Sequence, residues 1–178
     1  MIIELKREDV FARLDELSAL LRDAVEHGAS MGFMLPLPGA EVRDYWNGVA
    51  AQIAAGGKVA LAALDAAGRV VGSAQLGLEL RANGRHRAEV QKVMVLHAAR
   101  GRGIGAALMG RIEEEARSRG RTLLFLDTSV GRSGAVEFYT RLGYTLCGGI
   151  PDYARDPDGP LAANAIFYKR LARAEPAG

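Results

Sequence analysis

The chain has few of the features that mark secreted, metal-binding or membrane proteins. A single cysteine, Cys147, among 178 residues excludes an intrachain disulfide and a metal site built from several cysteines. No apolar run approaches the roughly 20 residues that cross a bilayer, and the apolar start of the chain, interrupted by Glu4, is too short for a signal peptide. The net charge of +2 is small and the basic residues are dispersed, which argues against a nucleic-acid partner. The sequence therefore favours a soluble cytoplasmic protein that binds neither nucleic acid nor membrane.

The composition is that of an ordinary globular protein. Hydrophobic residues make up 49% of the chain and charged residues 25%. A chain of this length can bury a substantial core within one domain, and we find neither an internal repeat nor a linker. We therefore expect a single domain over residues 1–171, followed by a flexible tail over residues 172–178.

The spacing of apolar residues predicts helices first and strands afterwards. After a short strand at residues 2–5, one helix is expected to begin at Asp9 as its N-cap and to stop before Gly28, and a second helix is expected over residues 41–55. Strands follow at 58–64, 69–80 and 87–95, joined by turn signals at Ala67-Gly68 and Asn83-Gly84. The rest predicts a helix at 104–119, a strand at 123–127, a helix at 133–142, a strand at 145–150, a loop at 151–160 and a strand at 165–171. This order indicates an α+β domain.

The most informative segment is the glycine-rich turn Arg100-Gly101-Arg102-Gly103-Ile104-Gly105. It lies between a predicted strand and a predicted helix, so several backbone N–H groups are expected to be unpaired at the positive end of the helix dipole. Without side chains in the way, a pyrophosphate can bind directly to those donors. Arg100 and Arg102 add charge-assisted donors at the same place. The turn is therefore a predicted diphosphate site.

Two ligands fit such a turn. Gly101, Gly103 and Ala106 match the dinucleotide pattern G-x-G-x-x-A, and Asp127 follows about twenty residues later. However, Leu96 to Ala99 separate the turn from its strand, and hairpin-like strands precede it. The alternative pattern, R/Q-x-x-G-x-G/A, resembles the acyl-CoA pyrophosphate loop of the GNAT N-acetyltransferases. We therefore expect coenzyme A, as acetyl-CoA, to be the ligand.

A second segment also resembles this family. Ser133, Phe138-Tyr139 and Gly143-Tyr144 are similar to the GNAT helix that faces the CoA thiol. The resemblance implies the GNAT fold, a central mixed and mostly antiparallel sheet of about seven strands flanked by about four helices. A narrower likeness is to the tabtoxin-resistance acetyltransferases, which acetylate the amine of a β-lactam amino-acid toxin. It is carried by residues 28–34, 73–76, 87–92, 126–128 and 157–159.

The family resemblance also implies roles in cofactor binding. Backbone groups of Met94 and Val95 are expected to pair with the pantetheine arm, and the Val95 N–H is the candidate oxyanion donor, which can contribute about 3 kcal/mol. The alternative is an ordinary buried strand pair. The expected acetyl-CoA contacts are Met94, Val95, Arg100, Gly101, Arg102, Gly103, Ile104, Gly105, Ala106, Ser133 and Tyr139.

The chemistry needs an acid and a base. Tyr139 is the candidate general acid for the departing thiolate, because a phenol is protonated at neutral pH. The alternative role is that of a core aromatic on a short helix. Ser133, where the family often has Asn, is expected to cap that helix. Glu89 and Asp127 are candidate bases for the acceptor ammonium, with a water chain as the alternative.

The acceptor side is less specific in sequence. Phe33, Met34, Tyr45 and Trp46 lie on N-terminal elements that cover the acceptor cleft in such folds, and Tyr153 lies on the late loop; each can equally be a core or turn residue. An acidic cleft with aromatic walls suits a small amino acid or another small amine. The three histidines form no ligand pair in sequence, so no metal is expected.

We therefore expect acetyl transfer from acetyl-CoA to a small-molecule amine, directly in a ternary complex. Cys147 has no neighbouring base in sequence, which disfavours an acetyl-cysteine intermediate. The alternatives are a protein N-terminal acetyltransferase, which needs an open groove, and a non-catalytic CoA-binding regulatory module. The sequence leaves monomer and homodimer open.

Overall fold

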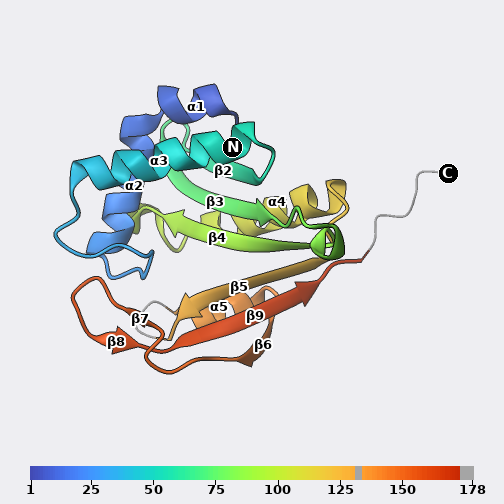
Figure 1. The fold of residues 1–178 in the computed structure, drawn as a ribbon. Coiled ribbons are helices and arrows are strands. Elements are labelled where there is room, and N and C mark those ends of the chain that lie inside the picture. The colour runs from blue at the N-terminus through green and yellow to red at the C-terminus, as the bar shows by residue number, and fades with distance from the viewer. Residues whose placement is uncertain (131–133, 173–178) are drawn as a thin grey trace.

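The protein is built around a seven-stranded mixed sheet, as predicted (Figure 1). The structure, a computed structural model, describes residues 1–130 and 134–172, so residues 173–178 of the expected tail lie outside the described residues. The strand order is β1-β2-β3-β4-β5-β9-β6, and among the described residues only β4 and β5 pair in parallel. The strands are β1 (Ile2–Leu5), β2 (Lys58–Leu64), β3 (Val70–Leu78), β4 (Arg87–Val95), β5 (Leu123–Ser129), β6 (Thr145–Gly148) and β9 (Asn164–Arg170).

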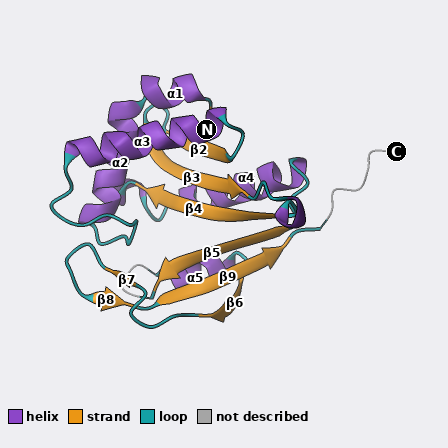
Figure 2. Ribbon diagram, viewed as in Figure 1, coloured by secondary structure: helices purple, strands orange, loops and turns teal. Residues whose placement is uncertain are grey.

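Helices cover both faces of this sheet (Figure 2). The helices are α1 (Arg7–Ala12), α2 (Leu14–Glu26), α3 (Gly39–Ala54), α4 (Ile104–Ser118) and α5 (Ala135–Arg141). Side chains alternate between the two faces of a strand. In β2, Ala60 and Ala62 accordingly pack with α1–α3, whereas Val59 and Leu61 pack in a second core with α4. Two separate cores thus hold the sheet between its helices.

The first predicted helix is two helices that meet at Arg13. The first of them begins at Arg7, not after Asp9. The Asp9 carboxylate still caps it, because Oδ2 accepts a hydrogen bond from the Lys6 backbone N–H (2.9 Å) at the helix start. The prediction of Asp9 as the N-cap is therefore wrong: the N-cap is Lys6, and Asp9 is the third residue of the helix, whose side chain bonds back to the N-cap.

The predicted loop over residues 151–160 contains a strand of a small hairpin. β7 (Ala154–Arg155) pairs with β8 (Leu161–Ala162). The turn between them is closed by the Asp156 N–H, which donates to the Pro160 carbonyl (2.8 Å). The hairpin lies beside the loop between α2 and α3 (Figure 1), and the Leu35 N–H donates to the Pro157 carbonyl (3.0 Å) across that junction.

β4 and β5 pair over only three positions. The pairs run from Arg87 with Leu123 to Glu89 with Phe125, after which the two strands separate (Figure 1). β4 also carries a bulge, because Gln91 pairs with Gln75 and Met94 with Ser73, which leaves one extra residue on β4. The separation opens the sheet at the place where the glycine-rich turn begins.

Gly110 offers a test of how helix propensity affects the stability of α4. It is an exposed residue of the helix interior, and a Cβ there meets no atom within 4 Å. We expect Gly110→Ala to raise the free energy of unfolding by about 0.5–1 kcal/mol, because alanine has the higher helix propensity. The same substitution at Gly68, a turn residue with φ +78°, is expected to lower it. Urea unfolding of both variants measures the two effects, and a destabilised Gly110→Ala variant contradicts the account of α4.

Candidate active site

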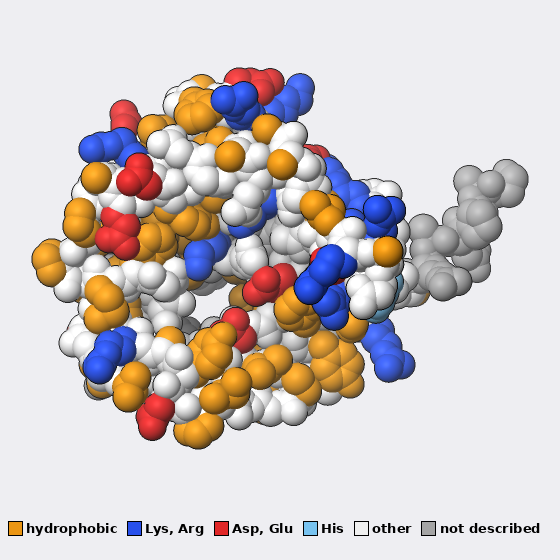
Figure 3. All heavy atoms as spheres, in the orientation of Figure 1, with side chains coloured by type: hydrophobic (Ala, Val, Ile, Leu, Met, Phe, Trp, Pro, Cys, Tyr) orange, Lys and Arg blue, Asp and Glu red, His pale blue; other side chains and the backbone are white. Residues whose placement is uncertain are grey.

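A large cavity lies where β4 and β5 separate. Its volume is about 1830 Å³, and Figure 3 shows this face of the molecule hollowed at its centre, with basic and acidic side chains around the hollow. β4, the start of α4 and α5 form one part of the wall. The end of α2 with its following loop, the end of β5 and the β7–β8 segment form another part. The cavity thus joins the predicted diphosphate site to the predicted acceptor elements.

The start of α4 presents unpaired donors to this cavity. Gly101 and Gly103 both have φ +76°, a left-handed conformation that favours glycine. The first helical hydrogen bond runs from the Ala107 N–H to the Gly103 carbonyl, and no side chain caps the helix. The N–H groups of residues 104–106 are therefore left without a helical acceptor, at the positive end of the dipole. The arrangement fits a diphosphate.

Gly105 allows α4 and α5 to approach each other. A Cβ at this position lies 3.3 Å from Cζ of Phe138, which is closer than ordinary van der Waals contact. Phe138 lies beside Tyr139, the candidate acid, on α5. The glycine at position 105 therefore permits the close approach of α4 to Phe138, the residue next to the candidate acid.

The two arginines of the turn lie at its surface. Arg100 lines the cavity, and its Nε donates to the Val95 carbonyl (3.2 Å). Arg102 lines a smaller hollow beside Met1 and Ile2, and its Nη2 donates to the Ala98 carbonyl (3.3 Å). Of the two, Arg100 is the one that the structure places at the cavity.

The backbone of β4 alternates between β3 and the gap. The Leu96 N–H donates to the Val71 carbonyl (3.0 Å) on the β3 side. Because successive residues of a strand direct their backbone groups to opposite sides, the Met94 groups also point toward β3, and those of Val95 and Val93 point into the gap. The Val95 N–H therefore points into the gap, as its predicted oxyanion role requires, whereas the backbone of Met94, predicted to pair with the pantetheine arm, points toward β3.

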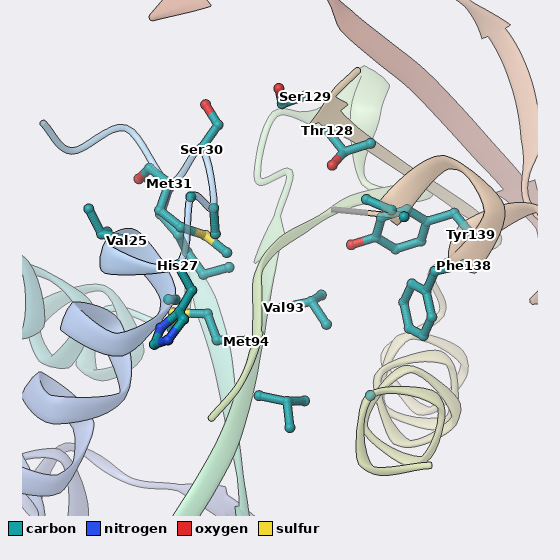
Figure 4. A pocket seen from close by; sticks show the side chains of 18 of the residues that line it. Val25, His27, Ser30, Met31, Val93, Met94, Thr128, Ser129, Phe138 and Tyr139 are labelled. Carbon is teal, nitrogen blue, oxygen red and sulfur yellow. Dashed lines mark hydrogen bonds between the residues drawn. The ribbon is translucent and has the colours of Figure 1, made fainter. Parts of the chain in front are cut away.

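Tyr139 is buried, and its hydroxyl points into the cavity toward β4 (Figure 4). Burial, and to a smaller extent the Asp127 carboxylate, raise the pKa of the Tyr139 phenol well above its usual value. The ring contacts Phe138, Tyr144 and Phe167 in the core around α5. The residue is therefore both a core aromatic and a phenol that stays protonated.

Glu89 and Asp127 both line the cavity, from β4 and β5. The Glu89 carboxylate accepts a hydrogen bond from Gln91 Nε2 (2.7 Å), and the Asp127 carboxylate accepts one from Asn164 Nδ2 (3.4 Å). Two acidic groups therefore lie on the two strands that separate, as the sequence led us to expect.

A polar network that the sequence did not reveal lies beside Glu89. Lys58 Nζ donates to the side-chain carbonyls of Gln75 (3.0 Å) and Gln91 (2.7 Å). Gln75 is fully buried, and its Nε2 lies 2.7 Å from the Tyr45 hydroxyl. Burial, and then the charge of Lys92, lower the pKa of Lys58 to about 8. The signal in sequence was a glutamine, Gln75, two residues after Ser73 in a strand that is otherwise without polar side chains.

Lys92 is a second cation in the same cavity. It lies in the bulge of β4 with φ +51°, and its Nζ donates to the Met31 carbonyl (2.8 Å). It also lies 6.0 Å from the centre of the Tyr45 ring. Burial lowers its pKa, against the opposing effect of Asp127 and Glu89. The predicted acidic cleft therefore contains two ammonium groups as well.

The aromatic candidates for the acceptor separate into two groups. Tyr45 and Tyr153 line the cavity. Trp46 is fully buried in the core and Phe33 packs edge-on against Tyr45, and neither is among the described residues that line the cavity. Met34 is exposed and also lies outside that lining.

Three further expectations concern Ser133, a bound metal and a membrane-spanning helix. Ser133 lies outside the described residues. His27 and His97, far apart in sequence, stack with their ring centres 4.0 Å apart, but residues 1–130 and 134–172 contain no group of three or more potential ligands that could hold a metal ion. Over the same described ranges, no helix is long and apolar enough to cross a membrane.

The model of the acetyltransferase (GNAT) family matches residues 33–144. The chain therefore belongs to the acetyltransferase (GNAT) family.

Individual relatives agree with this assignment. The chain is similar to an L-methionine sulfoximine/L-methionine sulfone acetyltransferase of Pseudomonas paraeruginosa, with 28% identity over 82% of each chain. It is 45% identical to an aminoalkylphosphonate N-acetyltransferase of Salmonella typhimurium over 32% of this chain and 36% of that protein. Among solved structures, a ribosomal-protein-alanine N-acetyltransferase of Brucella melitensis has a TM-score of 0.77 at 27% identity, covering 96% and 99% of the two chains. The chain matches three of the curated relatives, including the aminoalkylphosphonate N-acetyltransferase, over only 25 to 45% of their own lengths.

Proposed function

We propose that the protein is an acetyl-CoA-dependent N-acetyltransferase that acts on a small amine by direct transfer. The observation that carries this proposal is the gap between β4 and β5, which has unpaired α4 donors at its edge and a protonated phenol facing it. Acetyl-CoA, when bound, supplies the thioester that the amine attacks. The donors of residues 104–106 and the side chain of Arg100 bind the pyrophosphate, and the Val95 N–H donates to the thioester oxygen as negative charge develops there.

The acceptor amine enters as an ammonium and must lose a proton. Glu89 and Asp127 line the cavity on the two separating strands and bind that ammonium, and Glu89 takes its proton directly or through water. Tyr139 donates its proton to the thiolate as it leaves, and the second proton, which the nitrogen loses on becoming an amide, passes to the Tyr139 phenolate and restores the phenol. In this scheme the acid, the Tyr139 phenol, is already protonated near neutral pH, because burial raises its pKa.

Replacing the base tests this scheme. We expect Glu89→Gln to lower kcat/KM roughly 100-fold at pH 7, because the amine is then deprotonated only by solvent. The loss is expected to shrink toward pH 9.5, where more of the amine is already neutral. Steady-state kinetics at both pH values measure it, with the exposed α4 residue Glu114 changed to Gln as the control. An equal loss at both pH values contradicts the role of Glu89 as base.

The closure of the cavity favours a small acceptor over a peptide. The Leu35–Pro157 hydrogen bond joins the α2–α3 loop to the β7–β8 segment across one side of the cavity, which obstructs an extended chain. Two relatives carry names that specify small amines, an amino-acid sulfoximine or sulfone and an aminoalkylphosphonate. A β-lactam amino acid of the tabtoxin type belongs to the same size class and remains a prediction.

Thiol release from acetyl-CoA distinguishes the alternatives. The panel contains α-amino acids, β-lactam amino acids, aminoalkylphosphonates, aminoglycosides, polyamines and short peptides. We expect release with one class of small amine and little release with peptides. Preferred turnover of a peptide N-terminus overturns the small-amine assignment. Acetyl-CoA binding without release for any amine supports the non-catalytic module instead.

A further inference from the structure

We propose that the acceptor carries an oxyanion, such as a carboxylate or phosphonate, that Lys58 and Lys92 bind in the cavity while Glu89 and Asp127 hold its ammonium. This inference rests on the proposed function, because it specifies the acceptor of the same site. According to this inference, the cavity prefers zwitterionic acceptors to amines that carry no anionic group.

The first observation is where the lysines lie. The chain contains four lysines and nineteen arginines, and two of the four lysines line this one cavity. Lys58 comes from the start of β2 and Lys92 from the bulge of β4, so two segments far apart in sequence bring ammonium groups together. Their charges are close enough that Lys92 lowers the pKa of Lys58. Two like charges gathered in a partly closed space indicate a site for an anion.

The second observation is how these ammonium groups are bonded. Lys58 donates to two neutral amide oxygens, and Lys92 donates to one neutral backbone carbonyl. Within residues 1–130 and 134–172, neither lysine forms a salt bridge with a carboxylate. Each ammonium has three N–H donors, so a donor remains on Lys58 and two remain on Lys92. An oxyanion can accept these remaining donors from both lysines.

The third observation is the backbone of Lys92. A lysine with φ +51° is strained, and such residues persist where the surrounding structure holds them, often at functional sites. The bulge redirects this side chain to the Met31 carbonyl and the Tyr45 ring. The chain thus accepts local strain in a position that places a cation inside the cavity.

The charges also have the order that a zwitterion requires. Gln91 links the two ends, since its Oε1 accepts from Lys58 and its Nε2 donates to Glu89. One amide therefore separates a cation from an anion across the floor of the cavity. An acceptor with a short separation between its ammonium and its oxyanion can meet both ends together, while a neutral amide in place of the oxyanion leaves the remaining N–H donors of both lysines without an anionic acceptor.

The test compares matched acceptors in matched variants. The probes are L-methionine with L-methioninamide, and 2-aminoethylphosphonate with ethylamine, each pair differing in the oxyanion. We expect wild type to prefer the anionic member of at least one pair on the order of 10-fold to 100-fold in kcat/KM. Lys58→Met and Lys92→Met are expected to remove most of that preference by lowering turnover of the anionic member alone. The pair with the larger preference tells whether the site takes a carboxylate or a phosphonate.

Lys6→Met is the control, because Lys6 is the exposed residue before α1 and does not line the cavity. Circular dichroism shows whether Lys92→Met folds, since Lys92 lies in the bulge of β4. If that variant does not fold, Lys58→Met, whose position is regularly paired in β2, is used for the test. Equal losses for charged and neutral acceptors in Lys58→Met overturn the proposal and indicate a base or a structural role. Equal turnover of both members of each pair by wild type also overturns it. Failure of the proposed function has a different signature, namely no thiol release with any amine.

Discussion

Replacing Tyr139 with Phe is expected to lower kcat by roughly 100-fold or more while leaving the affinity for acetyl-CoA nearly unchanged. The substitution removes one hydroxyl from a ring that is packed against Phe138, Tyr144 and Phe167. The packing therefore stays, and the proton for the departing thiolate is lost. Steady-state kinetics and calorimetric titration with acetyl-CoA separate the two quantities.

The pH profile adds a second test of this residue. Because burial and the Asp127 carboxylate raise the pKa of the Tyr139 phenol, the acid remains protonated beyond pH 10, and wild type is expected to show no loss of kcat from this group below that pH. Tyr168→Phe on β9, outside the cavity lining, is the matched control. A Tyr139→Phe variant with wild-type kcat contradicts the role of the phenol and leaves Tyr139 as a core aromatic.

The second large effect is expected at the start of α4. Gly103→Asp places a carboxylate where we propose that the pyrophosphate binds, whereas Gly103→Asn adds a side chain of the same shape without the charge. Both residues tolerate the left-handed conformation of Gly103 (φ +76°) better than other side chains do. We expect the Kd for acetyl-CoA to rise on the order of 100-fold in the Asp variant, because charge-assisted hydrogen bonds to the phosphates are lost and like charges repel.

The Asn variant is expected to weaken binding much less, about tenfold or below, since it keeps the electrostatics of the helix end. Raising the salt concentration is expected to reduce the difference in Kd for acetyl-CoA between the two variants, because salt screens the added charge. Calorimetric titration at two salt concentrations measures both effects. Equal affinities of the Asp and Asn variants contradict the placement of the pyrophosphate at this helix start.

Much of the fold was predictable because its signals are local. The alternation of β2 and the glycine-rich turn before α4 are both legible over a few residues, and the structure confirms the sheet of about seven strands. The break at Arg13 was missed because the apolar stripe continues across it in sequence. The β7–β8 pairing was missed because two-residue strands have almost no periodicity.

The residues on the acceptor side of the cavity were less predictable, because the pairing of strands that are far apart in sequence brings them together. Lys58 reaches Gln91 only because β2, β3 and β4 lie side by side, and nothing within either segment marks that meeting. The position of the Lys92 side chain depends on a bulge in β4 that no residue pattern in the sequence indicates. Trp46 on α3 and Phe33 in the loop before it have the residue types of a binding wall, yet both pack into the core.

The most direct test of the central claim is mass spectrometry of the acceptor after incubation with acetyl-CoA, for wild type and Tyr139→Phe side by side. We expect wild type to place one acetyl group on the amine of a small zwitterionic acceptor, in an amount equal to the thiol released, and Tyr139→Phe to form far less in the same time. Acetyl-CoA bound tightly by wild type, with no acetylated product from any acceptor in the panel, contradicts the account.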